Sequence, residues 1–295
     1  MPHPELKAIL ERYRIDDGDG FRLADHDPDD KGGVDFGKGA GEALLAVAVE
    51  RLSELQQLLY ADASWSVLAV FQAMDGGGKD GTIKRVMSGV NPQGVAVHSF
   101  KQPGPVELGH DFLWRIHQAL PLRGQIGIFN RSHYEEVLVT RLHPEVIDKQ
   151  HIPEELRAGE RFWKHRYQDI RAFERYLARQ GVVVLKFFLN ISKEEQRQRL
   201  LARLDDPGKN WKFSEADLKE RALWDGYQEA YEGAIRETAR PKAPWFVVPG
   251  NHKWFAHLVV VQAMIDALEA LDLKPPSPAS RKVLDASRHA LKGEK

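Results

Sequence analysis

A cluster of glycines with one lysine stands directly after a short apolar run, where it has the chemistry of an anion site. Residues 71–86 read FQAMDGGGKDGTIKRV, so Gly76, Gly77 and Gly78 lead into Lys79. Glycines let consecutive backbone N–H groups point into one cavity, and the lysine adds a positive charge that suits bridging phosphates. This is the arrangement of the phosphate-binding loop written GxxxxGK[ST]. We therefore expect a catalytic Lys79 that faces solvent before ligand binds, and glycines that bind phosphate.

The segment departs from that pattern at two positions. Ala73 replaces the first glycine, and Asp80 stands where a serine or threonine hydroxyl would bind magnesium. Another ligand must replace the hydroxyl, and the nearby carboxylate of Asp75 is the candidate. A plain glycine-rich turn with an exposed lysine is the alternative. The strand, the loop, the lysine and the positive end of a helix dipole together favour the anion site, with Asp80 and Gly81 also binding phosphate.

A second polar cluster follows the apolar run GQIGIFN. It places Asn130, Arg131, His133 and Glu135 at or just past the carboxyl end of a strand, where open α/β sheets bind ligands. P-loop folds usually have a carboxylate at the position of Asn130, which carries no charge. We expect Arg131 to neutralise the charge of phosphate oxygens in catalysis. We expect Glu135 to be a catalytic metal ligand together with Asp75, and the alternative is that Glu135 is an ordinary residue of the first turn of a helix. His133 is grouped with the phosphate-binding residues, with a structural role as the alternative.

Basic side chains crowd residues 196–217, which read QRQRLLARLDDPGKNWKFSEAD. In nucleoside monophosphate kinase folds, such a basic insertion before the last strand is a lid that closes over phosphates and excludes water. We expect a helical lid at about residues 197–222, whereas Arg197 and Arg199 fit a solvated helix face. The lid cations that we assign to phosphate binding are Arg203, Lys209 and Lys212.

Alternating apolar runs and amphipathic segments predict the elements that position these clusters. Residues 42–60 carry apolar side chains on one helical face, and the runs WSVLAVFQ, GVAVHSF, GQIGIFN and GVVVLKFF are typical of buried parallel strands. The pattern continues with a long helix at 160–179, a last strand WFVVPG and a helix at 254–271. The aromatic face of the helix at 160–179 fits either the core or a subunit interface. Strands that alternate with helices indicate a three-layer α/β/α fold with a parallel sheet.

The chain divides into three parts by composition. Residues 1–41 are dense in Asp, Gly and Lys and predict an irregular N-terminal arm. Residues 42–272 form the predicted P-loop kinase domain. Residues 273–295 carry prolines, small residues and charges, so we expect a peripheral C-terminal tail.

Composition excludes several kinds of site. The 295 residues include 42 Lys and Arg against 43 Asp and Glu, a net charge of −1, so bulk charge predicts no partner. The absence of cysteine excludes disulfides, thiolate metal sites and cysteine nucleophiles, and fits a cytoplasmic location. No apolar run approaches the roughly 20 residues that span a bilayer, and we expect no export signal or membrane partner.

The combined motifs MDGGGKDG, NRSHYEEVLVTR and KNWKFSEAD make the chain, between about Phe36 and Leu271, resemble the family-2 polyphosphate kinases. The resemblance implies a fold similar to thymidylate kinase and reversible phosphoryl transfer between inorganic polyphosphate and a nucleotide, with Mg²⁺ or Mn²⁺. It assigns the first motif to Asp75 and Lys79 and the second to Asn130 and Arg131. The NRSHYE segment resembles the branch that phosphorylates both mono- and diphosphates. AMP, ADP, ATP or the guanine equivalents are the implied nucleotides, and a homo-oligomer is the expected assembly.

Further basic residues suit such a linear polyanion, which needs several cations along a line. They follow the first two predicted strands and are Lys84, Arg85, Lys101 and Arg115. Two other functions stay open. An ATP-dependent nucleoside monophosphate kinase would share fold and lid, but Asp80 stands where its P-loop carries a hydroxyl. A nucleic-acid-binding protein would also need a basic cleft, but the near-neutral charge and the lack of a basic stripe with interleaved aromatics count against it, so we expect no nucleic acid partner.

Overall fold

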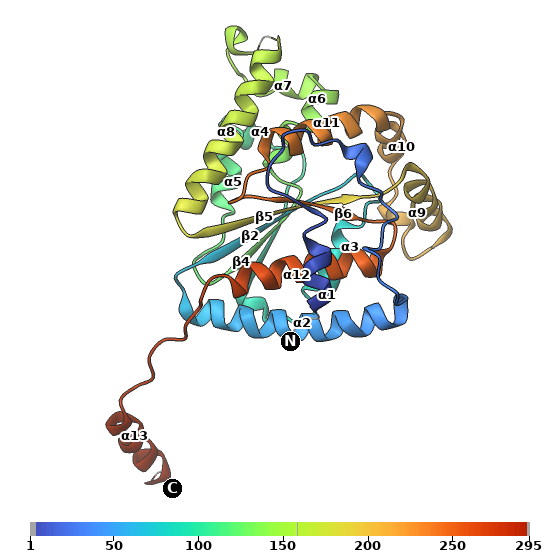
Figure 1. Cartoon of the computed structure of the whole chain (residues 1–295). Coiled ribbons are helices and arrows are strands. Elements are labelled where there is room, and N and C mark those ends of the chain that lie inside the picture. The colour runs from blue at the N-terminus through green and yellow to red at the C-terminus, as the bar shows by residue number, and fades with distance from the viewer. Residues whose placement is uncertain (1–3, 158, 294–295) are drawn as a thin grey trace.

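The computed structural model describes residues 4–157 and 159–293, and its centre is one sheet covered by helices on both faces (Figure 1). In the described residues the sheet has six strands, in the order β1-β6-β5-β2-β4-β3. The strands are β1 (Arg14–Ile15), β2 (Ser66–Gln72), β3 (Val95–Ser99), β4 (Ile126–Asn130), β5 (Val182–Asn190) and β6 (Trp245–Pro249).

The five strands from β2 to β6 run parallel, which confirms the predicted sheet. Phe71 of β2 lies opposite Asn130 of β4 and Phe187 of β5, so the carboxyl ends of these strands meet at one edge. The short β1 adds an antiparallel pair at the border with β6. The loops that leave β2 and β4 are therefore neighbours, which brings the two predicted clusters together.

Strand β2 shows why these apolar runs form central strands. All seven of its residues are buried. Val67, Ala69 and Phe71 face one hydrophobic core, whereas Leu68 and Val70 face the other, because successive side chains of a strand point to opposite faces. A strand buried on both faces reads as a continuous apolar run, and the three-layer α/β/α prediction is confirmed.

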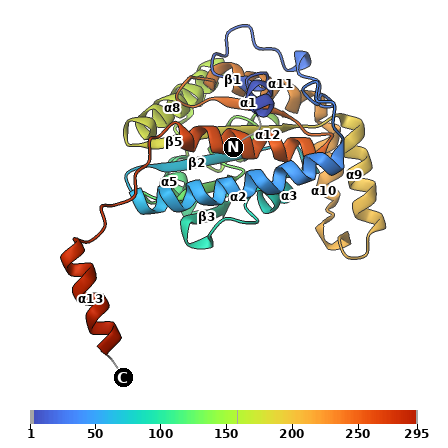
Figure 2. The same cartoon turned by 60° about the horizontal axis from the view of Figure 1, so that its bottom comes forward.

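The helices divide between the two cores, and Figures 1 and 2 show them on either side of the sheet. The first core contains α1 (Pro4–Leu10), α2 (Lys38–Asp62), α3 (Lys79–Val86) and α12 (Lys253–Glu269). The second contains α5 (Trp114–Gln118), α8 (Gly159–Arg179) and α11 (Trp224–Thr238). Of the aromatic residues on α8, Phe162, Tyr167 and Phe173 are buried, so this face belongs to the core.

Shorter elements connect these layers. The remaining helices near the sheet are α4 (Pro105–Leu108), α6 (Val139–Leu142) and α7 (Glu145–Asp148). The 3₁₀ turns are η1 (Leu23–Asp25), η2 (Pro92–Gly94), η3 (His133–Glu136), η4 (Glu154–Leu156) and η5 (Asn210–Lys212). The segment predicted as a lid lies in α9 (Lys193–Asp205), η5 and α10 (Glu215–Ala222), which extend from one end of the molecule (Figure 2).

The N-terminal segment is more ordered than the sequence indicates. The prediction of an irregular arm is wrong for α1 and β1, because Ile9, Leu10 and Tyr13 are buried in the first core. The few apolar residues of this segment are grouped where they meet α12 and β6, so they pack despite the polar surroundings. Residues 1–3 lie outside the described part of the chain.

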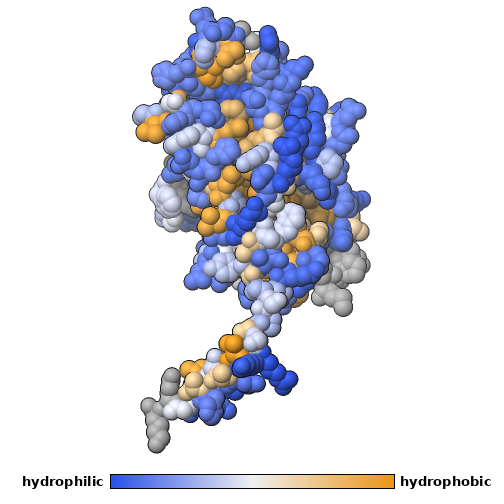
Figure 3. All heavy atoms as spheres, turned by 90° about the vertical axis from the view of Figure 1, so that its left-hand side faces the viewer, coloured by the Kyte–Doolittle hydropathy of each residue, from blue (hydrophilic) through white to orange (hydrophobic). Residues whose placement is uncertain are grey.

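The C-terminal segment ends in α13 (Arg281–Gly293), which projects away from the body of the molecule (Figures 1 and 3). Its described side chains are all exposed, including Val283 and Leu291. Helices within the described residues are too short or too polar to cross a membrane.

Candidate active site

The glycine-rich loop connects β2 to α3 at the carboxyl edge of the sheet. Gly76 and Gly78 have φ angles of +79° and +93°, a region that glycine enters without the steric cost of a β-carbon. Gly78 caps α3, whose first residue is Lys79, while Gly77 and Gly81 lie in the loop and the first turn of the helix. The N-terminus of α3 therefore adds its dipole to the lysine charge, as an anion site requires.

Lys79 folds back on its own loop. Its Nζ donates a hydrogen bond of 2.6 Å to the carbonyl oxygen of Ala73, and the residue is only 9% exposed. The expectation of a solvent-facing lysine is therefore wrong, because the ammonium is turned inwards to a backbone acceptor of its own loop. Burial, followed by repulsion from Arg131, lowers the pKa of Lys79 to about 8.

Arg131 connects the two clusters. Its Nη2 donates to Oδ1 of Asp75 at 2.7 Å, and its Nη1 lies 3.7 Å from Oε2 of Glu135. The backbone N–H of Arg131 donates to the carbonyl oxygen of Phe71 at the end of β2. Its φ angle is +63°, a left-handed conformation that costs a non-glycine residue free energy. Such strain at the carboxyl edge of a sheet fits a residue held for function.

Glu135 lies in η3, the turn that follows Arg131, and its side chain reaches back to the end of β2. Its Oε1 accepts a hydrogen bond of 3.1 Å from Nε2 of Gln72, and burial raises its pKa. The sequence analysis did not identify Gln72. The signal was present, since Gln72 is a polar residue that ends an otherwise apolar strand next to the glycine loop.

Asp80 and Asn130 form a further bridge between the clusters, with Nδ2 of Asn130 donating to Oδ1 of Asp80 at 2.7 Å. In the described residues no group of three or more His, Cys, Asp or Glu side chains is arranged to hold a metal ion. The predicted ligands Asp75 and Glu135 instead share Arg131 as a cation. Carboxylate and amide oxygens nevertheless are the donors that Mg²⁺ prefers, so the donor set fits this metal.

His133 does not reach the phosphate loop. Its side chain is fully buried, its Nε2 lies 3.7 Å from Oε1 of Glu174, and its ring packs against Tyr134 and Phe173. The grouping of His133 with the phosphate-binding residues is therefore wrong in this structure, and its structural alternative is the better description. The reason is the turn at 132–136, which points the ring inwards and Glu135 towards the loop.

The lid cations occupy different environments. Nη1 of Arg203 donates to Asp217 at 3.0 Å, and Nζ of the exposed Lys209 donates to Asp206 at 2.5 Å. Lys212 ends η5, and its side chain lies outside the described part of the chain. Arg197 is exposed and pairs with Glu194, as expected for a solvated face.

Arg199 contradicts the prediction of a solvated face. Its side chain is only 10% exposed and reaches the carbonyl oxygens of Gly76 and Gly77 from outside the loop. Gln196, one turn earlier, donates to the carbonyl oxygen of Asp75 at 2.8 Å. Helix α9 is therefore part of the wall that supports the loop.

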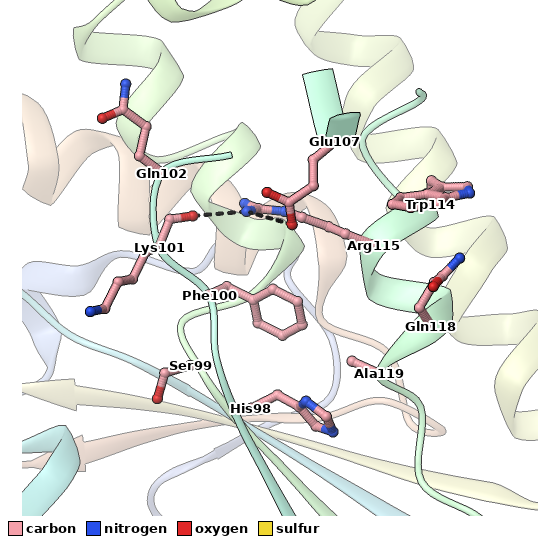
Figure 4. Close-up of a pocket in the computed structure, with 10 residues that line it drawn as sticks. All are labelled: His98, Ser99, Phe100, Lys101, Gln102, Glu107, Trp114, Arg115, Gln118 and Ala119. Carbon is pink, nitrogen blue, oxygen red and sulfur yellow. Dashed lines mark hydrogen bonds and ion pairs between the residues drawn. The ribbon is translucent and has the colours of Figure 1, made fainter. Parts of the chain in front are cut away.

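The remaining predicted cations lie around a cavity of about 450 Å³ and on α3. Lys84 and Arg85 are exposed in the last turn of α3. Lys101 lines the cavity, where Nη1 of Arg115 donates to its carbonyl oxygen at 2.8 Å and lies 3.7 Å from Glu107 (Figure 4). Strand β3, which leads to Lys101, pairs with β4, so the cavity adjoins the second cluster.

Comparisons with known proteins identify the chain. The family model for Polyphosphate kinase 2 matches residues 37–276. The chain belongs to the polyphosphate kinase 2 family. An AMP/ADP-polyphosphate phosphotransferase of Meiothermus ruber is 50% identical over 93% of this chain and 99% of its own length. An ADP-polyphosphate phosphotransferase of Rhodopseudomonas palustris is 51% identical over 84% of this chain and 86% of its own length.

A crystal structure of Polyphosphate Kinase 2 from Arthrobacter aurescens has the same fold, with a TM-score of 0.87, 42% identity and coverage of 97% of both chains. The predicted family membership is therefore confirmed, and the protein is an enzyme of the phosphotransferase class. The site residues that sequence reasoning missed are Gln72, Gln196 and Arg199.

Proposed function

We propose that this protein catalyses reversible, magnesium-dependent phosphoryl transfer between inorganic polyphosphate and nucleoside mono- and diphosphates. It makes ATP from ADP and ADP from AMP, and guanine nucleotides are further candidates. The observation that carries the proposal is the convergence of Lys79, Arg131 and two carboxylates at the junction of β2 and β4. The printed activities of the relatives from M. ruber and R. palustris support it.

Charge neutralisation and positioning are what phosphoryl transfer chiefly requires. Lys79 and Arg131 supply two cations, and each contacts a protein acceptor. An incoming phosphate exchanges the carbonyl oxygen of Ala73 and the carboxylate of Asp75 for its own oxygens. The two cations then stabilise the negative charge on the transferred group.

Asp75 and Glu135 are the residues that would hold Mg²⁺ or Mn²⁺. Their carboxylates supply oxygen donors beside the phosphate loop, and the amide oxygen of Asn130 lies in the same cluster. The metal would neutralise charge on the phosphate oxygens and orient them. Release of Asp75 from Arg131 would make both the guanidinium and the carboxylate available for this role.

Two regions accommodate the substrates. The polyphosphate chain follows the cations of the lid and of α3 towards Lys101, because a linear polyanion requires cations in series. These cations are Arg203, Lys209, Lys212, Lys84 and Arg85. The nucleotide occupies the cavity of about 450 Å³, where Arg115, whose guanidinium lies over the buried ring of Phe100, offers a cation.

The decisive experiment uses ADP and long-chain polyphosphate with Mg²⁺ and no added ATP. The proposal predicts ATP in an amount that scales with polyphosphate, and ADP when AMP replaces ADP. A nucleoside monophosphate kinase would disproportionate ADP without polyphosphate, so ATP that is independent of polyphosphate would reject the proposal in favour of that enzyme. Salt-sensitive binding of nucleic acid without phosphate transfer would favour the third function.

Assembly and location remain predictions. A homo-oligomer is tested by light scattering of the purified chain, in which a monomer mass at micromolar concentration would contradict it. A cytoplasmic location rests on the absence of cysteine and agrees with a requirement for nucleotides and polyphosphate.

A further inference from the structure

Arg199 on α9 uses its whole guanidinium to join three segments of the chain. Its Nε donates to Oε1 of Glu195 at 2.6 Å. Its Nη1 lies 3.3 Å and 3.2 Å from the carbonyl oxygens of Gly76 and Gly77. Its Nη2 donates at 2.6 Å to the carbonyl oxygen of Gly250, between β6 and α12. A planar guanidinium with five N–H donors is the side chain that can make these contacts together.

These contacts fix the direction of the loop peptides. In a trans peptide the N–H of one residue points away from the carbonyl of the residue before it. Because the carbonyl of Gly77 points to Arg199, the N–H of Gly78 in the same trans peptide points away from α9. The loop contains three consecutive glycines, which have more conformational freedom than other residues. The contacts from Arg199 therefore restrict the backbone more here than they would in a turn without glycine.

A second contact from the same helix supports this arrangement. Nε2 of Gln196 donates to the carbonyl oxygen of Asp75 at 2.8 Å, and Oε1 of Gln196 accepts from Arg221 at 2.7 Å. Arg221 lies in α10, at the far end of the predicted lid segment. The first and last helices of that segment are thus connected to the backbone of the phosphate loop.

We propose that Arg199 is a positioning residue for phosphoryl transfer, which holds the phosphate loop against the β6–α12 junction and couples the loop to the lid helices. The proposal rests on the proposed function and adds a residue that acts through the loop backbone. Its guanidinium contacts the Glu195 carboxylate and backbone carbonyl oxygens of two segments, and the proposal is that it keeps these partners during transfer while Lys79 and Arg131 exchange theirs for phosphate. Loss of Arg199 therefore slows the chemical step and leaves the electrostatic attraction of polyphosphate unchanged.

The test compares Arg199→Met with Arg197→Met. Both substitutions remove an arginine from the same helix and break an ion pair with a glutamate, but Arg197 is exposed and pairs only with Glu194 in the contacts described. We expect Arg197→Met to retain wild-type rates. In Arg199→Met, kcat falls on the order of 100-fold, as for a misplaced catalytic group. The KM for polyphosphate and its dependence on salt stay within about twofold, since no phosphate contact is lost.

A lysine variant separates the effect of the bridging contacts from the effect of the positive charge. It also provides a second folded protein in case Arg199→Met does not fold. Lysine keeps the positive charge but cannot bridge Gly77 and Gly250 together, so Arg199→Lys should fold with a wild-type melting temperature and stay at least about tenfold slow in kcat. Wild-type kcat in either folded variant, or a KM effect that lysine restores, would overturn the proposal. If Arg199→Met fails to melt cooperatively, the lysine variant decides alone.

The two proposals fail in distinguishable ways. If the wild-type chain and Arg197→Met make no ATP from polyphosphate and ADP, the proposed function is wrong. If both are active and the Arg199 variants are equally active, the function stands and only the clamp is refuted.

Discussion

Replacement of Arg131 by glycine and by alanine separates catalysis from stability at one position. Both substitutions remove the cation that lies 2.7 Å from Asp75 and 3.7 Å from Glu135. The Arg131 side chain is 40% exposed, so loss of these pairs costs only about 0.5–1 kcal/mol of unfolding free energy. The same arginine stabilises transferred charge, a role whose removal lowers kcat about 1,000-fold or more in phosphoryl transfer.

The two variants differ in backbone strain. Alanine keeps a β-carbon at the φ of +63°, where the left-handed conformation costs about 1–2 kcal/mol. Glycine removes that cost. It also raises the conformational entropy of the unfolded chain, which lowers the free energy of unfolding by about 0.4–1 kcal/mol. The glycine variant should therefore be more stable than the alanine variant by about 0.8 kcal/mol, the difference between the centres of these two ranges. For a domain of this size that is a melting temperature higher by about 1–4 °C.

The assay combines thermal melting with initial rates of polyphosphate-dependent ATP formation, using the wild-type chain as reference. We expect kcat to fall equally in both variants, while the melting temperature of the glycine variant is the higher of the two. A glycine variant that melts below the alanine variant would refute the strain argument. A kcat above one tenth of wild type in either variant would refute the catalytic role of Arg131.

Three further predictions concern the same loop and the lid. Lys79→Ala should abolish transfer in a chain that still melts cooperatively, and wild-type kcat/KM should fall as pH rises above about 8, because Lys79 loses its charge there; a flat profile to pH 10 would contradict the role of that charge. Asp75→Asn should shift the magnesium activation curve to higher concentration, and an unchanged titration would move the ligand role to Glu135. Joint replacement of Lys209 and Lys212 by alanine should raise the KM for polyphosphate and reduce the salt dependence of that KM, without a change in melting temperature. A wild-type KM with a wild-type salt dependence would show that neither lysine binds polyphosphate.

Local sequence patterns were sufficient to predict the sheet and the phosphate loop. Strands β2, β4, β5 and β6 are short apolar runs, and such runs form interior strands because both of their faces must be buried. The prediction of a buried strand is wrong for β3, which ends the sheet and leaves Val97 exposed. The phosphate loop could be predicted because its glycines and Lys79 lie within about eight consecutive residues, so that the backbone conformation and the charge of the loop depend on local sequence. The positions of Asn130 and Arg131 followed from the rule that parallel strands place their carboxyl ends at one edge.

Contacts between distant segments could not be predicted in this way. The polar N-terminal segment gave no sign that Tyr13 is buried, because its partner Phe255 lies on a helix at the other end of the chain. His133 stands between two functional residues in the sequence, yet the 3₁₀ turn directs its ring into the core.

The amino-acid sequence by itself determined the family, the order of the strands along the chain and the chemical groups available at the site. Only the tertiary structure decided which arginine of α9 supports the phosphate loop. Arg197 and Arg199 are the same residue type and lie two positions apart in the sequence, but they point to different sides of the helix. Arg199 meets Gly76 across 123 residues of sequence, and a contact at that separation depends on how α9 packs against the sheet edge.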